Sequence, residues 1–568
     1  MTLPYRYRFI CALFLTVLAL SPSLALEVPP EVKALPVQYQ GRVMPFESFA
    51  REQILSVTGK LQMKGESPSA TALAWMANPS YAAGVEIFNA GYEPMLKEVG
   101  LDPKKHKHNL DDLLTARKIM QLGAESAQIK QQEGKPTRVQ SEAEKLLGKM
   151  GSHYALLTSQ IPAFIPPVGN PDGNWAAMDD TSAAIDSAAA GIQMGVLGLI
   201  SAFKAGNTKQ MADLAREMTR VAKERWNPGH DRLRHFDTEV LYNQLRPIQW
   251  GRLLYLIALL LLLGSLVGST QLLHRLAGWV IWAAFLAHLS GLGMRAVIGA
   301  RAPWSNFYES LITITAAMVA FGLIFSRGRI RPLLLGGTAF AGYAALLIAD
   351  NAGLTPGVDT LVPALQSYWL NIHVIIILSG YAVATTAMIL GHGSLGVEAF
   401  RPLDKELYTA TTKAIHRSVQ MAVLLLFAGT ILGGIWAHEA WGRYWGWDPK
   451  ETWALISWFG YLGVAHARYA GWLNPRGLAL AVIGVYPLIL MTYYGVNYLL
   501  SGLHSYAGGE SAQIPPLLIG FLVFEAIVVI VGVKGWHTKF GGPYGGDGDS
   551  SNGKDKMVKA VVSSGGAN

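Results

Sequence analysis

The sequence predicts an α-helical polytopic membrane protein, with about nine transmembrane helices preceded by a mostly helical extracytoplasmic domain. Only 15% of its 568 residues are charged and 51% are hydrophobic, whereas soluble globular domains carry about 25% charged residues. The apolar residues are concentrated after Trp250. They form successive segments of about 20 residues, the length that a helix needs to cross about 30 Å of hydrocarbon.

Residues 1–25 have the pattern of a signal peptide or an N-terminal anchor. Arg6 and Arg8 precede a short apolar run, and small residues follow up to Ala25, which is the order typical of a secretory signal. The single cysteine, Cys11, lies in this segment. Cleavage after Ala25 would leave no thiol, which excludes a disulfide framework, a thiolate metal site and a CxxCH motif in the mature chain.

Residues 26–249 are expected to form the extracytoplasmic domain. This region is polar, and we expect no run in it that is long enough to cross a bilayer. Stretches rich in Lys, Glu, Gln and Ala at 113–149 and 206–225 have helical periodicity, and a Pro/Gly/Asn loop lies at 162–174. No chemical motif marks this domain, so the sequence leaves open whether it guides a substrate or docks a partner.

Residues 250–536 are expected to form the multispanning domain, and residues 537–568 a disordered cytoplasmic tail of low complexity. The nine predicted membrane helices lie at 251–273, 276–299, 308–326, 330–349, 371–391, 417–437, 453–470, 475–496 and 514–533.

The distribution of basic residues gives the expected orientation. With the first helix entering from outside, the inner connections and the tail carry fifteen Lys and Arg residues, whereas the short outer connections carry three: Arg301, Arg443 and Lys450. Basic residues are retained on the cytoplasmic side, so the N-terminal domain is expected outside and the C-terminus inside. The formal net charge of +8 then reflects membrane orientation, and nucleic acid is not an expected partner.

The segment 436–458 is unusually rich in tryptophan. Six of the sixteen tryptophans fall within these 23 residues. One explanation is an aromatic belt at the membrane interface. Clustering on a single outer connection favours the alternative, a rigid, flat, apolar platform for a large planar ligand. The expected contacts are Trp441, Tyr444, Trp445, Trp447 and Trp453, with Arg443 and Asp448 beside them.

The end of this connection also has the pattern of a helix start. Asp448-Pro449 followed by Glu451 is typical of a capped N-terminus. Because capping explains the two carboxylates, we assign them no catalytic proton and predict no catalytic residue.

The segment from Trp441 to Trp453, WGRYWGWDPKETW, resembles the tryptophan-rich WWD signature of haem-handling proteins. It is most similar to that of the CcsA (ResC) family of cytochrome c biogenesis. The resemblance extends to Arg301–Ser310, Gln366–His373 and Gly502–Tyr506. These four ordered blocks cover most of 275–535 and none of 26–249.

Four histidines are the expected haem ligands. His373 and His504 lie on the outer side with the tryptophan loop, and neutral imidazole is a common axial ligand of haem iron. The resemblance implies that role for both, and a hydrogen-bonded surface histidine is the alternative for each. His466, deep in the seventh predicted helix, matches the histidine with which the family takes up haem inside the membrane. His288 is its expected partner, unless it only bonds to a neighbouring helix; His438 is expected to cap or hydrogen-bond.

The outer cations have two explanations. Arginine is well suited to bind the anionic propionates of haem. Arg301, Arg443 and Lys450 can equally pair with the nearby carboxylates Glu309, Glu439, Asp448 and Glu451. The sequence leaves both explanations open.

The resemblance implies a function in cytochrome c biogenesis. Haem b, carried as a non-covalent substrate, would be delivered across a bacterial inner membrane and presented on the periplasmic side to the CxxCH motif of an apocytochrome c. The chain would then belong to a holocytochrome c synthase complex with a CcsB (ResB)-like membrane protein and a thiol-reducing thioredoxin-like protein, surrounded by membrane lipid. The alternative is a multispanning transporter or quinone-linked redox subunit with a histidine proton relay, although only Glu525 is a centrally placed acid.

Overall fold

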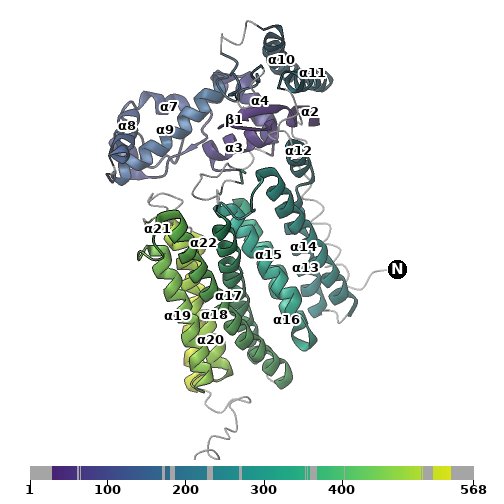
Figure 1. The fold of residues 1–568 in the computed structure, drawn as a ribbon, viewed down its shortest axis with the longest axis vertical. Helices are drawn as coiled ribbons and strands as arrows, with labels where there is room; N and C mark the ends of the chain where they lie inside the picture. The colour runs from purple at the N-terminus through teal and green to yellow at the C-terminus, as the bar shows by residue number, and fades with distance from the viewer. Residues whose placement is uncertain are drawn as a thin grey trace, which may run out of the picture. The chain divides into compact units, whose positions relative to one another are not determined.

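The computed structural model describes most of the chain (Figure 1), namely residues 28–60, 63, 65–132, 134–168, 173–179, 186–226, 235–267, 271–351, 354, 356–358, 367–401, 403–500, 502 and 516–538. The predicted signal segment, His504 and most of the predicted tail lie outside these residues. The chain divides into two compact units. The first takes the chain up to Ala316 together with Ala339–Ser367, and the second takes Ala317–Thr338 and the chain from Tyr368 onward.

The polar region before the membrane helices is mostly helical, as predicted. Its elements are α2 (Pro30–Lys33), β1 (Pro36–Tyr39), β2 (Arg42–Pro45), α3 (Phe46–Thr58), α4 (Pro68–Ala77), α5 (Pro79–Ala83), β3 (Phe88–Asn89), α6 (Glu93–Glu98), β4 (Lys107–His108), α7 (Leu110–Thr115), α8 (Lys118–Gln131), α9 (Arg138–Leu157), α10 (Ser187–Lys204), α11 (Thr208–Trp226) and α12 (Phe236–Leu245).

The strands form two short antiparallel pairs, β1 with β2 and β3 with β4. In the first pair Tyr39 lies opposite Arg42, and the two intervening residues, Gln40 and Gly41, have φ of 49° and 75°. Positive φ at both central positions is the requirement of a tight hairpin turn. The hairpin leads directly into α3, whose Phe46 and Phe49 are buried in the core of this domain.

The core of this domain also buries a histidine. His153 on α9 has no exposed surface, and its ring lies edge-on to Trp75 at 4.7 Å and to Phe88 at 5.4 Å between centroids. Burial lowers the pKa of His153 to about 4, because an apolar environment disfavours the charged imidazolium. His153 is therefore neutral at physiological pH.

One expectation for residues 26–249 was wrong. Among the described residues, α10 is long and apolar enough to cross a membrane. The apolar residues of α10 have another use in this fold, because Ala189, Ile192, Val196 and Leu199 point into the core of the domain. Their spacing is that of one helix face, so length and composition alone do not separate this helix from a span.

The membrane region consists of helices at all nine predicted positions. They are α13 (Pro247–Val267), α14 (Gln271–Gly299), α15 (Phe307–Phe325), η3 (Gly328–Ile330), α16 (Arg331–Asn351), α17 (Tyr368–Phe400), α18 (Lys405–Trp441), α19 (Pro449–Tyr469), α20 (Pro475–Leu490), the π-helical turn η5 (Met491–Gly495), α21 (Val496–Leu499) and α22 (Pro516–Thr538).

Nine helices in the described part of the chain have the length and composition of a membrane span. Eight of them coincide with predicted segments, and α10 is the ninth. The helix α19 forms where it was predicted, but it carries Lys450, Glu451, His466 and Arg468 and is too polar to be in this set. The polytopic helical fold is nevertheless confirmed.

Helices α17 and α18 pack closely in the second unit. A Cβ atom at Gly429 of α18 would lie 2.8 Å from Ile377, and one at Gly380 of α17 would lie 3.0 Å from Leu426. Small residues at these positions let the two helix backbones approach, as they commonly do between membrane helices. This packing brings the N-terminal part of α17 against the segment of α18 that leads into the tryptophan loop.

Candidate functional site

The tryptophan loop, residues 442–448, joins two well-terminated helices. At the end of α18, Gly442 has a φ of 73° and donates its N–H to the His438 carbonyl oxygen at 2.8 Å, a left-handed cap that favours glycine. At the start of α19, the Asp448 side chain accepts a bond from the Lys450 N–H at 2.9 Å. Asp448 and Glu451 form a capping box, which confirms the predicted helix start.

Glu451 holds the loop in shape. Its carboxylate accepts bonds from the N–H of Gly446 at 2.7 Å and of Asp448 at 3.2 Å, and it pairs with the Arg443 guanidinium at 3.3 Å. A Cβ atom at Gly446 would lie 1.6 Å from that guanidinium, so a side chain there would displace Arg443 from its present position. Of the two partners that the sequence left open for Arg443, the structure shows the carboxylate.

The aromatic rings of the loop are not coplanar, so the expected single flat platform was wrong. Trp445 and Trp447 meet at 90° with their centroids 5.7 Å apart, and Trp441 meets the buried Trp436 at 63° and 4.7 Å. Aromatic pairs prefer such edge-to-face contacts over a direct face-to-face sandwich. Two rings are strongly exposed, Trp447 at 71% and Tyr444 at 59%, and these are available to a ligand.

Behind the loop, a buried pair of hydroxyls fastens α19 to α20. Ser457 and Thr492 are fully buried and their hydroxyl oxygens lie 2.7 Å apart. The Thr492 hydroxyl also lies 2.9 Å from the carbonyl oxygen of Trp453, one turn inside α19. Thr492 belongs to η5, and π-helical turns are frequent at functional sites.

His373 lies in the first turns of α17 and faces α18. Its Nδ1 lies 2.7 Å from the carbonyl oxygen of Gly429, which can only accept a hydrogen bond, so Nδ1 carries the proton and donates it. The neutral ring then has its lone pair on Nε2. Metal-binding histidines commonly donate their other N–H to a backbone carbonyl in this way.

Two adjacent glycines of α18 connect His373 with the tryptophan loop. A Cβ atom at Gly433 would lie 2.7 Å from Cε1 of His373, and one at Gly434 would lie 3.0 Å from the carbonyl oxygen of Tyr444. The imidazole and the loop backbone therefore pack against neighbouring positions of one helix. The structure brings together these two parts of the predicted site.

The other outer histidines differ from His373. His504 falls outside the described residues, so its predicted role as second ligand is not tested. The exposed ring of His438 stacks on Tyr444, with centroids 4.2 Å apart and planes 8° apart. The sequence predicts a cap or a hydrogen bond for His438, and the contact that the structure shows for its ring is this stacking.

The two histidines predicted for an inner site belong to different units. His466 is exposed on α19, and its Nδ1 lies 2.9 Å from the Leu462 carbonyl oxygen, an arrangement that again places the lone pair on Nε2. His288 on α14 is completely buried in the first unit. Its ring nitrogens make no hydrogen bond of regular geometry. The backbone of Ile312 is a polar partner at a weaker geometry.

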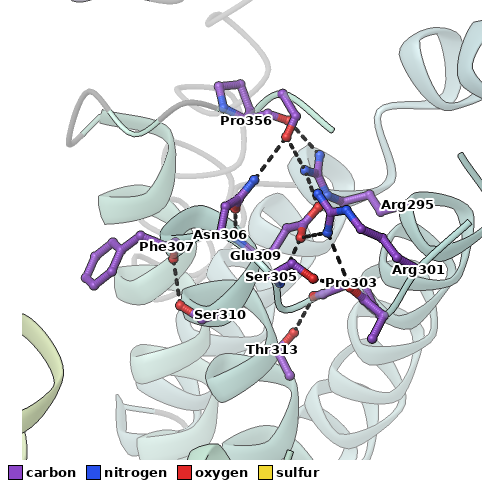
Figure 2. A network of polar contacts seen from close by, with 12 residues as sticks. Arg295, Arg301, Pro303, Ser305, Asn306, Phe307, Glu309, Ser310, Thr313 and Pro356 are labelled. Atoms are coloured by element: carbon purple, nitrogen blue, oxygen red, sulfur yellow. Dashed lines mark hydrogen bonds and ion pairs between the residues drawn. The ribbon is translucent and has the colours of Figure 1, made fainter. Parts of the chain in front are cut away.

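A buried charge cluster organises the block Arg301–Ser310, which carries part of the resemblance (Figure 2). Glu309 is completely buried and accepts bonds from Arg295 at 2.8 Å and Arg301 at 2.6 Å. Arg295 also donates to the carbonyl oxygens of Pro356 at 2.8 Å and Gly357 at 3.0 Å. The block thus fastens the ends of α14 and α15 to the 356–358 connection.

Sequence reasoning paired Arg301 with Glu309 as one alternative but missed Arg295. The signal was available, because Arg295 is the single charged residue of the predicted span 276–299. An ionisable residue inside a membrane segment normally has a specific partner. Arg295 is only 1% exposed, which fits a structural role in the interior of the first unit.

Glu525, the central acid of α22, is also partnered. It is 3% exposed and lies 3.2 Å from Nε2 of His392 on α17. Nδ1 of His392 in turn lies 3.0 Å from the Met388 carbonyl oxygen. Because both ring nitrogens face protein oxygens, His392 is a structural residue in this fold, with a hydrogen bond through Nδ1 and an ion-pair contact through Nε2.

Comparison with known proteins extends the resemblance into the N-terminal region, residues 26–249. The chain is 28% identical over 500 residues to the protein NrfI of Wolinella succinogenes, an alignment that covers 83% of this chain. Residues outside 26–249 make up less than two thirds of the sequence. The alignment must therefore include part of 26–249, and the expectation that no resemblance reaches this domain was wrong. The chain spans about half of NrfI, 53% of its length.

Residues 304–504, which contain the tryptophan loop and His373, match the family described as cytochrome C assembly protein. The chain is 34% identical over 240 residues to the cytochrome c biogenesis protein CcsA of Prochlorococcus marinus, covering 36% of this chain and 75% of that protein. It is 31% identical over 256 residues to CcsA of Trieres chinensis, covering 38% of this chain and 81% of the relative. The chain therefore belongs to the CcsA family of cytochrome c biogenesis proteins.

Proposed function

We propose that this chain binds haem b without a covalent link and presents it, outside the membrane, for attachment to the CxxCH motif of an apocytochrome c. Cytochrome c assembly requires haem handling, which supports haem as the substrate class. The observation that carries the proposal is the imidazole of His373, which is oriented by the Gly429 carbonyl and packed beside the tryptophan loop.

The outer site is assigned to His373 and His504 as the two axial ligands. Exposed Trp447 and Tyr444 supply aromatic surface to the porphyrin, while Trp441, Trp445, Trp453 and Asp448 hold the loop that carries them. Arg443 is partly exposed while it pairs with Glu451. It is the cation of this loop that we assign to a propionate.

The inner site is assigned to His466, which would receive haem from the membrane before it reaches the outer site. Its Nε2 carries the lone pair, as a ligand requires. His288 is the proposed partner within this chain. A CcsB-like chain is the alternative source of that second ligand.

The attachment chemistry is that of the two substrates. Each cysteine thiol of the apocytochrome adds across one haem vinyl group, so that a carbon–sulfur bond forms, the thiol proton passes to the other vinyl carbon, and nothing is oxidised. The chain contributes position and orientation, as one part of a holocytochrome c synthase complex. The cysteines must be reduced, which calls for a thioredoxin-like partner. We place the site on the periplasmic side of a bacterial inner membrane, with the C-terminus in the cytoplasm.

The test is the absorption spectrum of the purified protein with its copurified haem. The wild type should show a b-type spectrum, and His373→Ala should lose most of it. His438→Ala is the matched control, because His438 stacks on Tyr444 and should leave the spectrum nearly unchanged. Equal haem content in wild type and His373→Ala would contradict the outer site.

The transporter or redox alternative is favoured by one contact, that of the partly buried His392 with the buried Glu525, which is the kind of pair that a proton relay needs. Coexpression with a CxxCH substrate and a CcsB-like protein separates the two functions. The haem proposal expects His392→Gln to keep most covalent cytochrome formation and His373→Ala to abolish it. If the histidines instead relay protons, His392→Gln should abolish the activity and His373→Ala should keep most of it.

A further inference from the structure

The second unit contains a cavity of about 300 Å³ on the side opposite the tryptophan loop. It lies where α15 ends, η3 connects to α16, and α17 and α18 pass. Four cations line it: Arg327, Arg329, Lys413 and Arg417. These residues lie in segments with an excess of positive charge, which the proposed orientation places at the inner leaflet.

The positive charge of this cavity is largely uncompensated. None of the lining residues that the structure describes is acidic. Arg329 is paired outside the lining, with Asp404 and Glu406, both at 3.0 Å. Arg327, Lys413 and Arg417 are exposed and form no ion pair with an acidic side chain among the described residues. Three cations that converge on one cavity favour an anionic ligand.

The rest of the lining is apolar or carries hydroxyls. Phe325, Ile330 and Leu390 supply apolar wall, and Ser418 supplies a buried hydroxyl. Beside the cavity, Ile324 of α15 is 55% exposed, so apolar surface adjoins the charged site. A basic pocket between membrane helices next to apolar surface is typical of lipid headgroup sites.

The cavity is not a second haem site. Its lining includes no histidine, so it has no imidazole to hold iron. Its volume is at the lower limit of ligand pockets, about 300–1,000 Å³, which suits a headgroup better than a porphyrin. We propose that this cavity binds the phosphate headgroup of an anionic phospholipid, with an acyl chain along the apolar surface at Ile324.

Bound lipid at this position would stabilise the α17–α18 pair. Leu390 reaches the cavity from α17, and Lys413 and Arg417 reach it from α18. The same two helices carry His373 and the tryptophan loop at their other ends. Lipid occupancy therefore supports the helix pair that forms the site, and it does so without contacting the substrate.

The experiment compares two triple variants of equal charge. Arg327→Gln/Lys413→Gln/Arg417→Gln removes the cavity cations, and Arg331→Gln/Arg401→Gln/Lys405→Gln removes three cations of the same connections outside the lining. Both proteins are purified and the phosphatidylglycerol that stays bound is measured by native mass spectrometry. The cavity variant should retain at least tenfold less of this lipid than wild type, and the control should retain a wild-type amount.

Two further arms identify the ligand. Vesicles of phosphatidylglycerol should raise the melting temperature of the wild type and not that of the cavity variant, whereas phosphatidylcholine vesicles and inorganic phosphate alone should leave both unchanged. Equal lipid loss in the two triple variants would overturn the proposal, because it would mean general charge attraction. If inorganic phosphate raised the melting temperature of the wild type as much as phosphatidylglycerol vesicles do, the assignment to a lipid would be overturned. Loss of copurified haem from the cavity variant with unchanged lipid would make the cavity a haem site instead.

Discussion

Nδ1 of His373 lies 2.7 Å from the carbonyl oxygen of Gly429 across the α17–α18 contact. This bond selects the tautomer of the imidazole and holds the plane of its ring. The absence of a side chain at Gly433 makes room for the ring. The imidazole is thus oriented by the helix that faces it, before any substrate binds.

We expect Gly433→Ala to impair the outer site. A Cβ atom there would lie 2.7 Å from Cε1 of His373, so the ring must rotate and lose its bond to Gly429. The affinity for haem should fall about 10- to 100-fold, the range seen when a partner that orients a metal ligand is removed. The measurement is the amount of haem that copurifies with the protein. Gly463→Ala, on α19 with open space around its Cα, is the control, and an equal loss in both variants would contradict this reasoning.

Glu451→Ala should loosen the tryptophan loop. The change removes the acceptor of two backbone N–H groups and the partner of Arg443. We expect faster proteolysis within 442–448 and reduced haem retention in the purified protein. Asp448→Asn should behave like wild type, because asparagine caps a helix as well as aspartate does. A protected loop in Glu451→Ala would show that the carboxylate is dispensable.

Glu309→Gln should destabilise the first unit strongly. The change leaves the buried Arg295 and the partly buried Arg301 without the carboxylate that both of them contact. Breaking a buried ion pair in this way costs about 3–5 kcal/mol, which should appear as a lower melting temperature and a smaller yield of folded protein. The exposed Glu217, paired with Arg220, provides the control, since Glu217→Gln should leave melting unchanged. Unaltered melting of Glu309→Gln would contradict a structural role.

The N-terminal helical domain should become less stable in acid because of His153. The pKa of this group is about 4 when folded and 6.5 when unfolded, so the unfolded chain binds more protons between these values. Stability therefore falls as the pH drops from 6.5 to 4, by about 3 kcal/mol in total. Burial also lowers the pKa of His108, which adds to the effect.

His153→Phe should remove this part of the acid sensitivity. Thermal melting of the full chain at pH 7 and pH 4.5 is the measurement, followed by hydrogen exchange in 138–157. The exposed His106 is the control, because His106→Asn should keep the wild-type pH dependence. An unchanged pH dependence in His153→Phe would show that His153 does not titrate in this range.

Local patterns predicted the helices well. All nine predicted segments are helical, and the Asp448–Glu451 pattern gave the start of α19 correctly, because apolar runs and capping depend on neighbouring residues. The fate of α10 was missed for the same reason. Hydropathy records how apolar a segment is, and only tertiary packing decides whether Ile192 and Val196 face lipid or the core of a domain.

The parts of the site that depend on distant residues could not be predicted. The bond between His373 and Gly429 joins positions 56 residues apart, and nothing in either local sequence indicates it. The prediction of a flat aromatic platform was wrong because composition gives the number of rings and not the angles between them. Arg295 was overlooked because its partners, Glu309 and the 356–358 connection, lie in later segments.

The hydroxyl pair of Ser457 and Thr492 has a consequence for motion. Through Thr492, α20 is bonded to the first turns of α19, and α20 continues through η5 and α21 toward the segment that contains His504. The tryptophan loop, which ends at the start of α19, and the chain that leads toward His504 are therefore both attached to the Ser457–Thr492 pair. A tilt of α20 would move the first turns of α19, where the tryptophan loop ends, together with η5 and α21.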